Sequence, residues 1–210
     1  MENVSFPNPV VILVNGKFPS HSLSIQKLNN AGTIICTDGS ADKLLAHERT
    51  PDVIIGDMDS TKLNKDDFKG VWSIAPDQNK TDLQKTLDWC IVNDLKDVTV
   101  LGATGKREDH SLGNLHLLAE FSKKLKMIFF SDHAIIYSFK GKRTFSSLKG
   151  QQISIVSIEQ VHSISTVGLK YELNSEPLPP SCSGISNEAI SDKFTIETTE
   201  PIWLFINHFH

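Results

Sequence analysis

The sequence predicts an α/β N-terminal domain, with a mostly parallel open sheet and helices on both faces, followed by an all-β C-terminal sandwich. Up to residue 131, short β-branched runs alternate with helical patterns, which is typical of parallel strands joined by helices. After that point, short strand-like segments follow one another with turn residues between them and no helical period. We therefore expect domains at residues 1–131 and 132–210.

The first half contains six short apolar runs that predict strands. They cover residues 10–14, 33–37, 53–55, 71–75, 98–101 and 127–130. Between them, helices are expected over 22–30, from Ser40 as N-cap through Leu44 and Leu45, and near 62–68.

Two later helices are better marked. The helix after Asp77 begins with a capping box, Thr81 and Gln84, because a threonine side chain can accept from the backbone N–H three residues on. Its expected apolar face repeats at helical spacing and consists of Leu83, Leu87, Cys90 and Ile91. The helix after His110 is expected to bury Leu112, Leu115, Leu118 and Ala119.

The second half consists of short segments that predict antiparallel strands. They cover residues 135–139, 143–147, 152–158, 163–171, 193–197 and 202–206. The proline-rich stretch 176–180 is expected to be a loop.

Composition narrows the class of protein. With 210 residues, 39% hydrophobic and 22% charged, the chain is an ordinary globular protein. Its net charge of −4 argues against a nucleic-acid partner, which would favour a basic face. No apolar run is long enough for a membrane span and the first residues show no signal pattern, so we expect a cytoplasmic protein without a membrane partner. Cys36 and Cys90 are expected in the core.

The loop Gly56-Asp57-Met58-Asp59 directly follows the strand at 53–55. Loops at the carboxyl ends of strands line the ligand crevice of open α/β sheets. Two carboxylates there suit Mg²⁺, which takes one or two carboxylates together with substrate phosphates. The alternative is a solvated turn held by its own Asp hydrogen bonds.

Three other acidic or glycine-bearing loops also follow predicted strands, at residues 38–39, 77–82 and 102–110. In a parallel sheet these loops share one edge, which favours a metal-dependent phosphate site. Asp82 is expected to hold metal or, alternatively, to cap its helix. Lys80 and Arg107 are candidates to neutralise phosphates, and His110 is either a phosphate donor or an ordinary helix residue.

Three well-known site signatures are missing. The stretch 102–106 is one spacing short of a P-loop and lacks its hydroxyl residue. There is neither a Gly-x-Gly-x-x-Gly dinucleotide fingerprint nor a Gly-x-Ser-x-Gly nucleophile motif.

The motif set resembles the thiamine pyrophosphokinase family. The N-terminal motifs are Asp38-Gly-Ser-Ala-Asp42, Pro51-Asp52 with Gly56-Asp57-Met58-Asp59-Ser60, Asp77-Gln78-Asn79-Lys80-Thr81-Asp82, and residues 102–110. The C-terminal ones are Gly168-Leu169-Lys170-Tyr171 and Gly184-Ile185-Ser186-Asn187-Glu188. They occur in the family's order and spacing over most of the chain.

The resemblance implies a Mg²⁺-dependent enzyme that converts ATP and thiamine to AMP and thiamine diphosphate. It implies a catalytic, nucleotide-binding domain, then a domain for thiamine binding and dimerisation, in a homodimer with active sites at the interface. Carried over by motif, the metal and catalytic residues are Asp57, Asp59 and Asp82. The nucleotide and phosphate residues are Asp38, Asp77, Lys80, Thr81, Arg107, Asp109 and His110. The thiamine residues are Gln78, Ser186 and Asn187, the last two from the other subunit.

Two positions depart from the family pattern. The loop Gly102-Ala-Thr-Gly-Lys-Arg107 has fewer glycines than usual, and Trp203 is one residue away from the tryptophan that stacks on thiamine. A shift by one residue points a strand side chain to the opposite face, so Trp203 is expected in the core. Two alternative functions remain: another Mg²⁺-dependent phosphoryl or nucleotidyl transferase on this scaffold, and a thiamine- or nucleotide-binding protein without catalysis.

Overall fold

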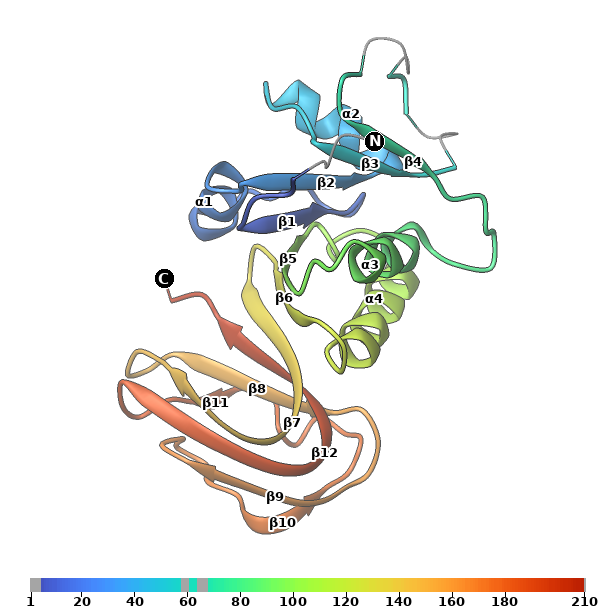
Figure 1. The fold of residues 1–210 in the computed structure, drawn as a ribbon. Coiled ribbons are helices and arrows are strands. Elements are labelled where there is room, and N and C mark those ends of the chain that lie inside the picture. Colours follow the sequence, from blue (N-terminus) through green and yellow to red (C-terminus); the bar gives the residue numbers. More distant parts are fainter. Residues whose placement is uncertain (1–4, 58–60, 64–67, 210) are drawn as a thin grey trace. The chain divides into compact units, whose positions relative to one another are not determined.

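The computed structural model describes residues 5–57, 61–63 and 68–209. The chain divides into two compact units, Met1–Asp132 and His133–His210 (Figure 1). None of the helices in the described ranges is both long and apolar enough to span a membrane.

The N-terminal unit alternates strands and helices. Its strands are β1 (Val10–Leu13), β2 (Thr33–Thr37), β3 (Val53–Gly56), β4 (Val71–Ile74), β5 (Asp97–Leu101) and β6 (Lys126–Phe130). Its helices are α1 (Ser22–Asn29), α2 (Asp38–Ala46), α3 (Asp82–Val92) and α4 (Glu108–Phe121).

These strands form a parallel sheet in the order β6-β5-β1-β2-β3-β4. All residues of β1, β2 and β3 are buried, as their continuous apolar runs require when helices cover both faces of a sheet. The strand order reverses between β1 and β5. Because crossovers are right-handed, α1 and α2 lie on one face while α3 and α4 lie on the other (Figure 1).

The start of α3 confirms the predicted capping box on its threonine side. The Thr81 hydroxyl accepts a hydrogen bond from the backbone N–H of Gln84 at 3.3 Å. Leu83, Leu87 and Cys90 are buried on the face predicted for this helix, whereas Ile91 is 37% exposed. Burial raises the pKa of the Cys90 thiol to about 12.

Two helix predictions were wrong in detail. Helix α2 begins at Asp38 with Thr37 as its N-cap residue; the buried Ser40 hydroxyl instead donates to backbone carbonyls of Leu13 and Thr37. Helix α4 buries Asn114, Leu117, Leu118 and Phe121. Leu112 is 54% exposed, because Asn114, a polar residue, occupies the buried face. The helix expected near 62–68 falls largely outside the described residues.

The C-terminal unit is antiparallel throughout. Its strands are β7 (Ala134–Ser146), β8 (Gln152–Ser157), β9 (Val161–Val167), β10 (Asn174–Leu178), β11 (Asn187–Glu188) and β12 (Lys193–Asn207). Strand β12 pairs with β7 along its length, with β9 in its first half, and with β8 in its second half. Side chains from β8, β9 and β12 share one hydrophobic core.

Three strand predictions in this unit need correction. The segments expected at 135–139 and 143–147 form the single strand β7, which continues through Gly141, and the last two segments likewise form β12. The stretch expected as a loop contains strand β10, which pairs irregularly with β9 at the sheet edge. An edge position tolerates Pro177, which has no N–H to donate.

Asp132 stabilises the loop between β1 and α1. Its carboxylate accepts from the Ser20 and His21 backbone N–H groups at 2.8 and 2.9 Å, and it pairs with Lys17 at 2.9 Å. Burial alone would raise its pKa, but these hydrogen bonds, with that of the Ser20 hydroxyl, outweigh burial and hold the pKa well below the usual range. Asp132 therefore stabilises the fold as an anion.

We expect Asp132→Ala to lower the free energy of unfolding by about 2 kcal/mol, because hydrogen bonds to a charged group are lost. A depressed folded-state pKa contributes stability that is present above the unfolded pKa, about 4, and is lost as the pH falls through the folded pKa. Urea unfolding between pH 2 and 7 measures both effects. Asp97→Asn, in an exposed pair with Lys126, should stay within about 0.5 kcal/mol. Equal losses in the two variants would contradict the assignment.

Candidate functional site

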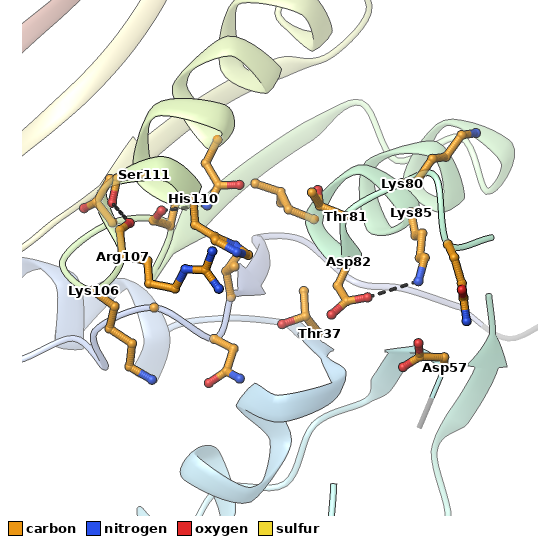
Figure 2. A pocket seen from close by; sticks show the side chains of 18 residues that line it. Thr37, Asp57, Lys80, Thr81, Asp82, Lys85, Lys106, Arg107, His110 and Ser111 are labelled. Carbon is orange, nitrogen blue, oxygen red and sulfur yellow. Dashed lines mark hydrogen bonds and ion pairs between the residues drawn. The ribbon is translucent and has the colours of Figure 1, made fainter. Parts of the chain in front are cut away.

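The N-terminal unit carries a pocket of about 520 Å³ at the carboxyl ends of its strands (Figure 2). It lies where the strand order reverses, between the loops that follow β1 and β5, which is the usual place for a ligand in an open α/β sheet. The residues lining it are Val14, Asn15, Gly16, Thr37, Asp57, Gln78, Lys80, Thr81, Asp82, Leu83, Lys85, Ala103, Thr104, Lys106, Arg107, His110, Ser111 and Asn114.

The loops after β1 and β5 pack backbone against backbone at this pocket. The Gly16 N–H donates to the Gly102 carbonyl at 2.8 Å, and the Lys17 N–H donates to that of Thr104 at 3.0 Å. A Cβ on Gly16 would lie 2.1 Å from the Gly102 oxygen, and Gly102 itself has φ +69°. The close approach of the two loops therefore requires glycine at positions 16 and 102.

Two carboxylates from different elements face the pocket. Asp57 follows β3 and is exposed, while Asp82 opens α3 (Figure 2). The ammonium of Lys85, whose side chain is only 5% exposed, pairs with Asp82 Oδ1 at 3.2 Å. Within the described part of the chain, Asp82 Oδ2 makes no hydrogen bond, so it is available to a ligand. Lys85 thus fixes the orientation of the Asp82 carboxylate.

Two cations that the sequence assigns to phosphates are engaged with neighbouring carboxylates. Lys80 pairs with Asp88 at 2.9 Å, and its ammonium points away from Asp57 and Asp82 (Figure 2). Arg107 binds Asp109 through two nitrogens, at 3.1 and 2.5 Å. Arg107, together with the His110 backbone N–H, lowers the pKa of Asp109 to about 2. Both cations line the pocket, and each already has a carboxylate beside it that balances its charge.

A further pair of cations meets at the loop after β1. Lys43, on α2, donates to the carbonyls of Gly16 at 3.0 Å and Asn15 at 3.3 Å. The ammonium of Lys106, from the loop after β5, lies close enough to interact with it. Burial and the neighbouring Lys106 lower the pKa of Lys43 to about 8.

The remaining predicted residues of this unit fall into two groups. Gln78, Thr81 and His110 line the pocket. Asp38, Asp77 and Asp109 do not: Asp38 is buried at the start of α2, Asp77 accepts from the Asn79 N–H at 2.9 Å in a local turn, and Asp109 pairs with Arg107. Asp59 lies outside the described residues.

Several lining residues were missed from the sequence. Lys85 follows Asp82 by three residues, a spacing at which helical side chains meet, so the ion pair between them could have been predicted from the sequence. Asn114 is buried and donates to the Ala103 carbonyl at 2.7 Å, which fixes α4 to the loop after β5. Thr37, Asn15 and Lys106 join the pocket only because the strand order brings their loops together.

In the C-terminal unit, Ser186 is exposed in a left-handed backbone conformation and its N–H donates to the Ser154 hydroxyl at 3.0 Å. Asn187 is 8% exposed, donates to the Tyr171 carbonyl at 2.7 Å and accepts from the Tyr171 N–H at 3.1 Å. Asn187 therefore holds the segment around Tyr171 in place. Trp203 is 6% exposed within β12, which agrees with its prediction as a core residue.

The pocket carboxylates fit a magnesium ion. No three His, Cys, Asp or Glu side chains within the described ranges are grouped so that they could hold a metal by themselves. Mg²⁺ does not require such a cage, since it keeps several waters and takes one or two carboxylates beside substrate phosphates. Asp57 and Asp82, with cationic side chains around the same pocket, match that pattern.

Two family models match the chain. One is described as thiamin pyrophosphokinase, catalytic domain, and matches residues 25–130; the other, thiamin pyrophosphokinase, vitamin B1 binding domain, matches residues 138–203. The first match covers β2 to β6 and α2 to α4, whereas β1 and the pocket-lining loop after it lie before residue 25.

Individual relatives agree with these matches. Thiamin pyrophosphokinase 1 of Caenorhabditis elegans is 28% identical over 182 residues, covering 79% of this chain and 75% of the relative. Thiamine pyrophosphokinase of Bacillus subtilis (strain 168) is 28% identical over 163 residues, covering 72% and 75%. The crystal structure of a Bacillus subtilis thiamine pyrophosphokinase has the same fold, with a TM-score of 0.80 at 24% identity over 96% of this chain and 99% of that one. The chain belongs to the thiamin pyrophosphokinase family.

Proposed function

We propose that the pocket of the N-terminal unit is where this thiamine diphosphokinase binds ATP with Mg²⁺ and transfers the pyrophosphoryl group. The oxygen of the thiamine hydroxyl bonds to the β-phosphorus, and the bond from that phosphorus to the α,β-bridging oxygen breaks. AMP leaves with the bridging oxygen, and a pocket carboxylate takes the hydroxyl proton. The observation that carries the proposal is that Asp57 and Asp82 face one pocket together with basic side chains.

Asp57 and Asp82 are the residues that would hold the metal, with Asp59 expected beside them from the sequence. A bound Mg²⁺ screens phosphate charge and orients the phosphates for in-line attack. Lys85 orients Asp82, since its buried ammonium lies 3.2 Å from Oδ1 and holds that oxygen in place. Chemistry of this kind depends on positioning and charge stabilisation rather than on a covalent intermediate.

The bond that breaks can be tested with isotopes. With ATP labelled by ¹⁸O at the α,β-bridging position, attack on the β-phosphorus leaves the label in AMP, which mass spectrometry detects. The rival reactions give other products: phosphoryl transfer yields ADP, and nucleotidyl transfer yields pyrophosphate and an adenylated acceptor. Labelled AMP that forms only with both thiamine and Mg²⁺ is expected; ADP or pyrophosphate as the main product would refute the mechanism.

We further propose that the C-terminal unit binds thiamine and forms a homodimer. Gln78 of one subunit and Ser186 of the other would contact thiamine, and the buried Asn187 would shape the segment beside them. The exposure of Ser186 supports a role in contacting a ligand. If both active sites lie at the subunit interface, each site needs the N-terminal unit of one subunit and the C-terminal unit of the other.

Subunit complementation tests this arrangement. Asp57→Asn impairs the nucleotide site, and Ser186→Lys places a positive charge where the thiazolium cation is expected. Each variant alone should be nearly inactive, whereas a mixed and reannealed population should recover about a quarter of wild-type activity. This follows because half of the dimers are mixed and half of their sites carry no substitution. No recovery, with mixed dimers demonstrated by mass spectrometry, would mean that sites lie within one subunit.

A further inference from the structure

Lys43 and Lys106 form a like-charge pair beside the pocket. Lys106 lines the pocket, and Lys43 contacts the backbone carbonyls of Asn15 and Gly16, which also line it. They come from separate elements, α2 and the loop before α4, and their ammonium groups interact. Lys43 is held in place by two carbonyl oxygens of the loop after β1, at 3.0 and 3.3 Å. These neutral acceptors satisfy its donors without cancelling its charge.

The other basic side chains of the pocket differ from this pair. Lys80, Lys85 and Arg107 each pair with a carboxylate, namely Asp88, Asp82 and Asp109. Within the described part of the chain, neither Lys43 nor Lys106 has a carboxylate at ion-pair distance. Two positive charges that repel each other without an acidic partner are costly in the free protein and are stabilised by a bound anion.

The position of the pair fits a phosphate. Lys43 contacts the carbonyls of Asn15 and Gly16, two residues that line the pocket beside the close packing of Gly16 on Gly102. In Figure 2, Lys106 lies on one side of the pocket, whereas Asp57 and Asp82 lie on the other. An anion at the lysine pair is therefore separate from the carboxylates proposed to hold Mg²⁺.

We propose that Lys43 and Lys106 form a second anion subsite, which binds phosphate oxygens of ATP that the carboxylate-bound magnesium does not cover. This inference rests on the proposed ATP site and adds two binding residues to it. Occupation of the subsite relieves the repulsion between the two ammonium groups, so binding of the polyphosphate and charging of Lys43 reinforce each other.

Charge-removing substitutions test the subsite. Lys106→Gln removes an exposed charge, and Lys43→Gln removes a half-buried one. We expect the KM for ATP to rise about tenfold in each variant, the scale of one charge-assisted hydrogen bond, with the KM for thiamine unchanged. Inhibition by inorganic tripolyphosphate, which carries the phosphates without the nucleoside, should weaken by a similar factor. Lys123→Gln, an exposed lysine beyond α4, is the matched control and should leave all three values unchanged.

A purely structural role predicts a different pattern. If Lys43 only tied the loop after β1, Lys43→Gln would lower Tm and kcat, while Lys106→Gln would leave the KM for ATP as in wild type. An unchanged KM and unchanged tripolyphosphate inhibition in Lys106→Gln would overturn the subsite. Lys106→Arg should restore ATP binding, because the charge returns.

Direct binding separates this inference from the proposed reaction. Calorimetry of wild type and Lys106→Gln with tripolyphosphate and no metal measures the subsite without turnover. Weaker binding in the variant supports the subsite even if the wild-type protein forms no AMP, a result that would refute the reaction alone. Equal binding in a protein that does form AMP would refute the subsite and leave the reaction standing.

Discussion

Asp57→Asn is expected to lower kcat by about 100- to 1,000-fold, the scale of losing one preorganised electrostatic group at a reacting centre. Asp57 is exposed at the pocket and the substitution keeps its shape, so the fold has little reason to change. The amide oxygen binds Mg²⁺ more weakly than a carboxylate, because Mg²⁺ is a hard cation. Steady-state assays over a range of Mg²⁺ concentrations should therefore show partial recovery at high Mg²⁺.

The matched control is Asp94→Asn, which removes an exposed carboxylate paired with Lys96 on the surface. Both variants should melt within about 1 °C of wild type, since surface substitutions change stability by less than about 0.5 kcal/mol. Near-normal turnover in Asp57→Asn, or a large activity loss in Asp94→Asn, would contradict the assignment of Asp57 to the metal.

Gly16→Ala is expected to have the largest effect on stability. Its Cβ would lie 2.1 Å from the Gly102 oxygen and 2.8 Å from that of Thr104, and both contacts are backbone atoms that cannot rotate away. Overpacking of this kind costs about 3 kcal/mol, which corresponds to a fall in Tm on the order of 10 °C. Activity should fall too, because the displaced loops line the pocket. Thermal melting and assays on the same samples measure both.

Gly113→Ala is the control for this substitution. Gly113 lies within α4, and a Cβ there meets nothing within 4 Å. Alanine favours a helix over glycine, so this variant should gain up to about 1 kcal/mol of stability. If both substitutions had the same effect, the close approach of the two loops would not be the reason for glycine at position 16.

The parallel part of the fold was predictable because its signals are local. Fully apolar runs such as 53–55 specify buried strands, and the strand-end rule then places Asp57 and Asp82 at one edge of the sheet. The pocket lined by both residues follows from that topology. The family resemblance, carried by motifs in the correct order, is confirmed by both family models.

The mistakes arose where tertiary contacts override local preference. Ser40 has the chemistry of an N-cap, yet its hydroxyl is used by the Leu13 carbonyl, which no local pattern reveals. Leu112 is exposed because α4 turns another face inward, on which Asn114 donates to the Ala103 carbonyl of the loop after β5. Strand β10 exists because β9 offers it an edge.

The partners of the charged side chains in the site also could not be predicted from local sequence patterns. Lys80 reaches Asp88 eight residues along the chain, and Lys43 meets Lys106 across more than sixty residues. Both depend on how the helices and loops are placed around the sheet. Residue types alone could therefore predict a candidate phosphate site, but not which of its cations are already paired.

The most direct test of the account measures AMP formed from ATP and Mg²⁺, with and without thiamine, followed by the mass of the product. We expect AMP to appear only with thiamine, in equal amount to a product with the mass of thiamine diphosphate. AMP formation that does not depend on thiamine, or thiamine binding without any AMP, would contradict pyrophosphoryl transfer in this pocket.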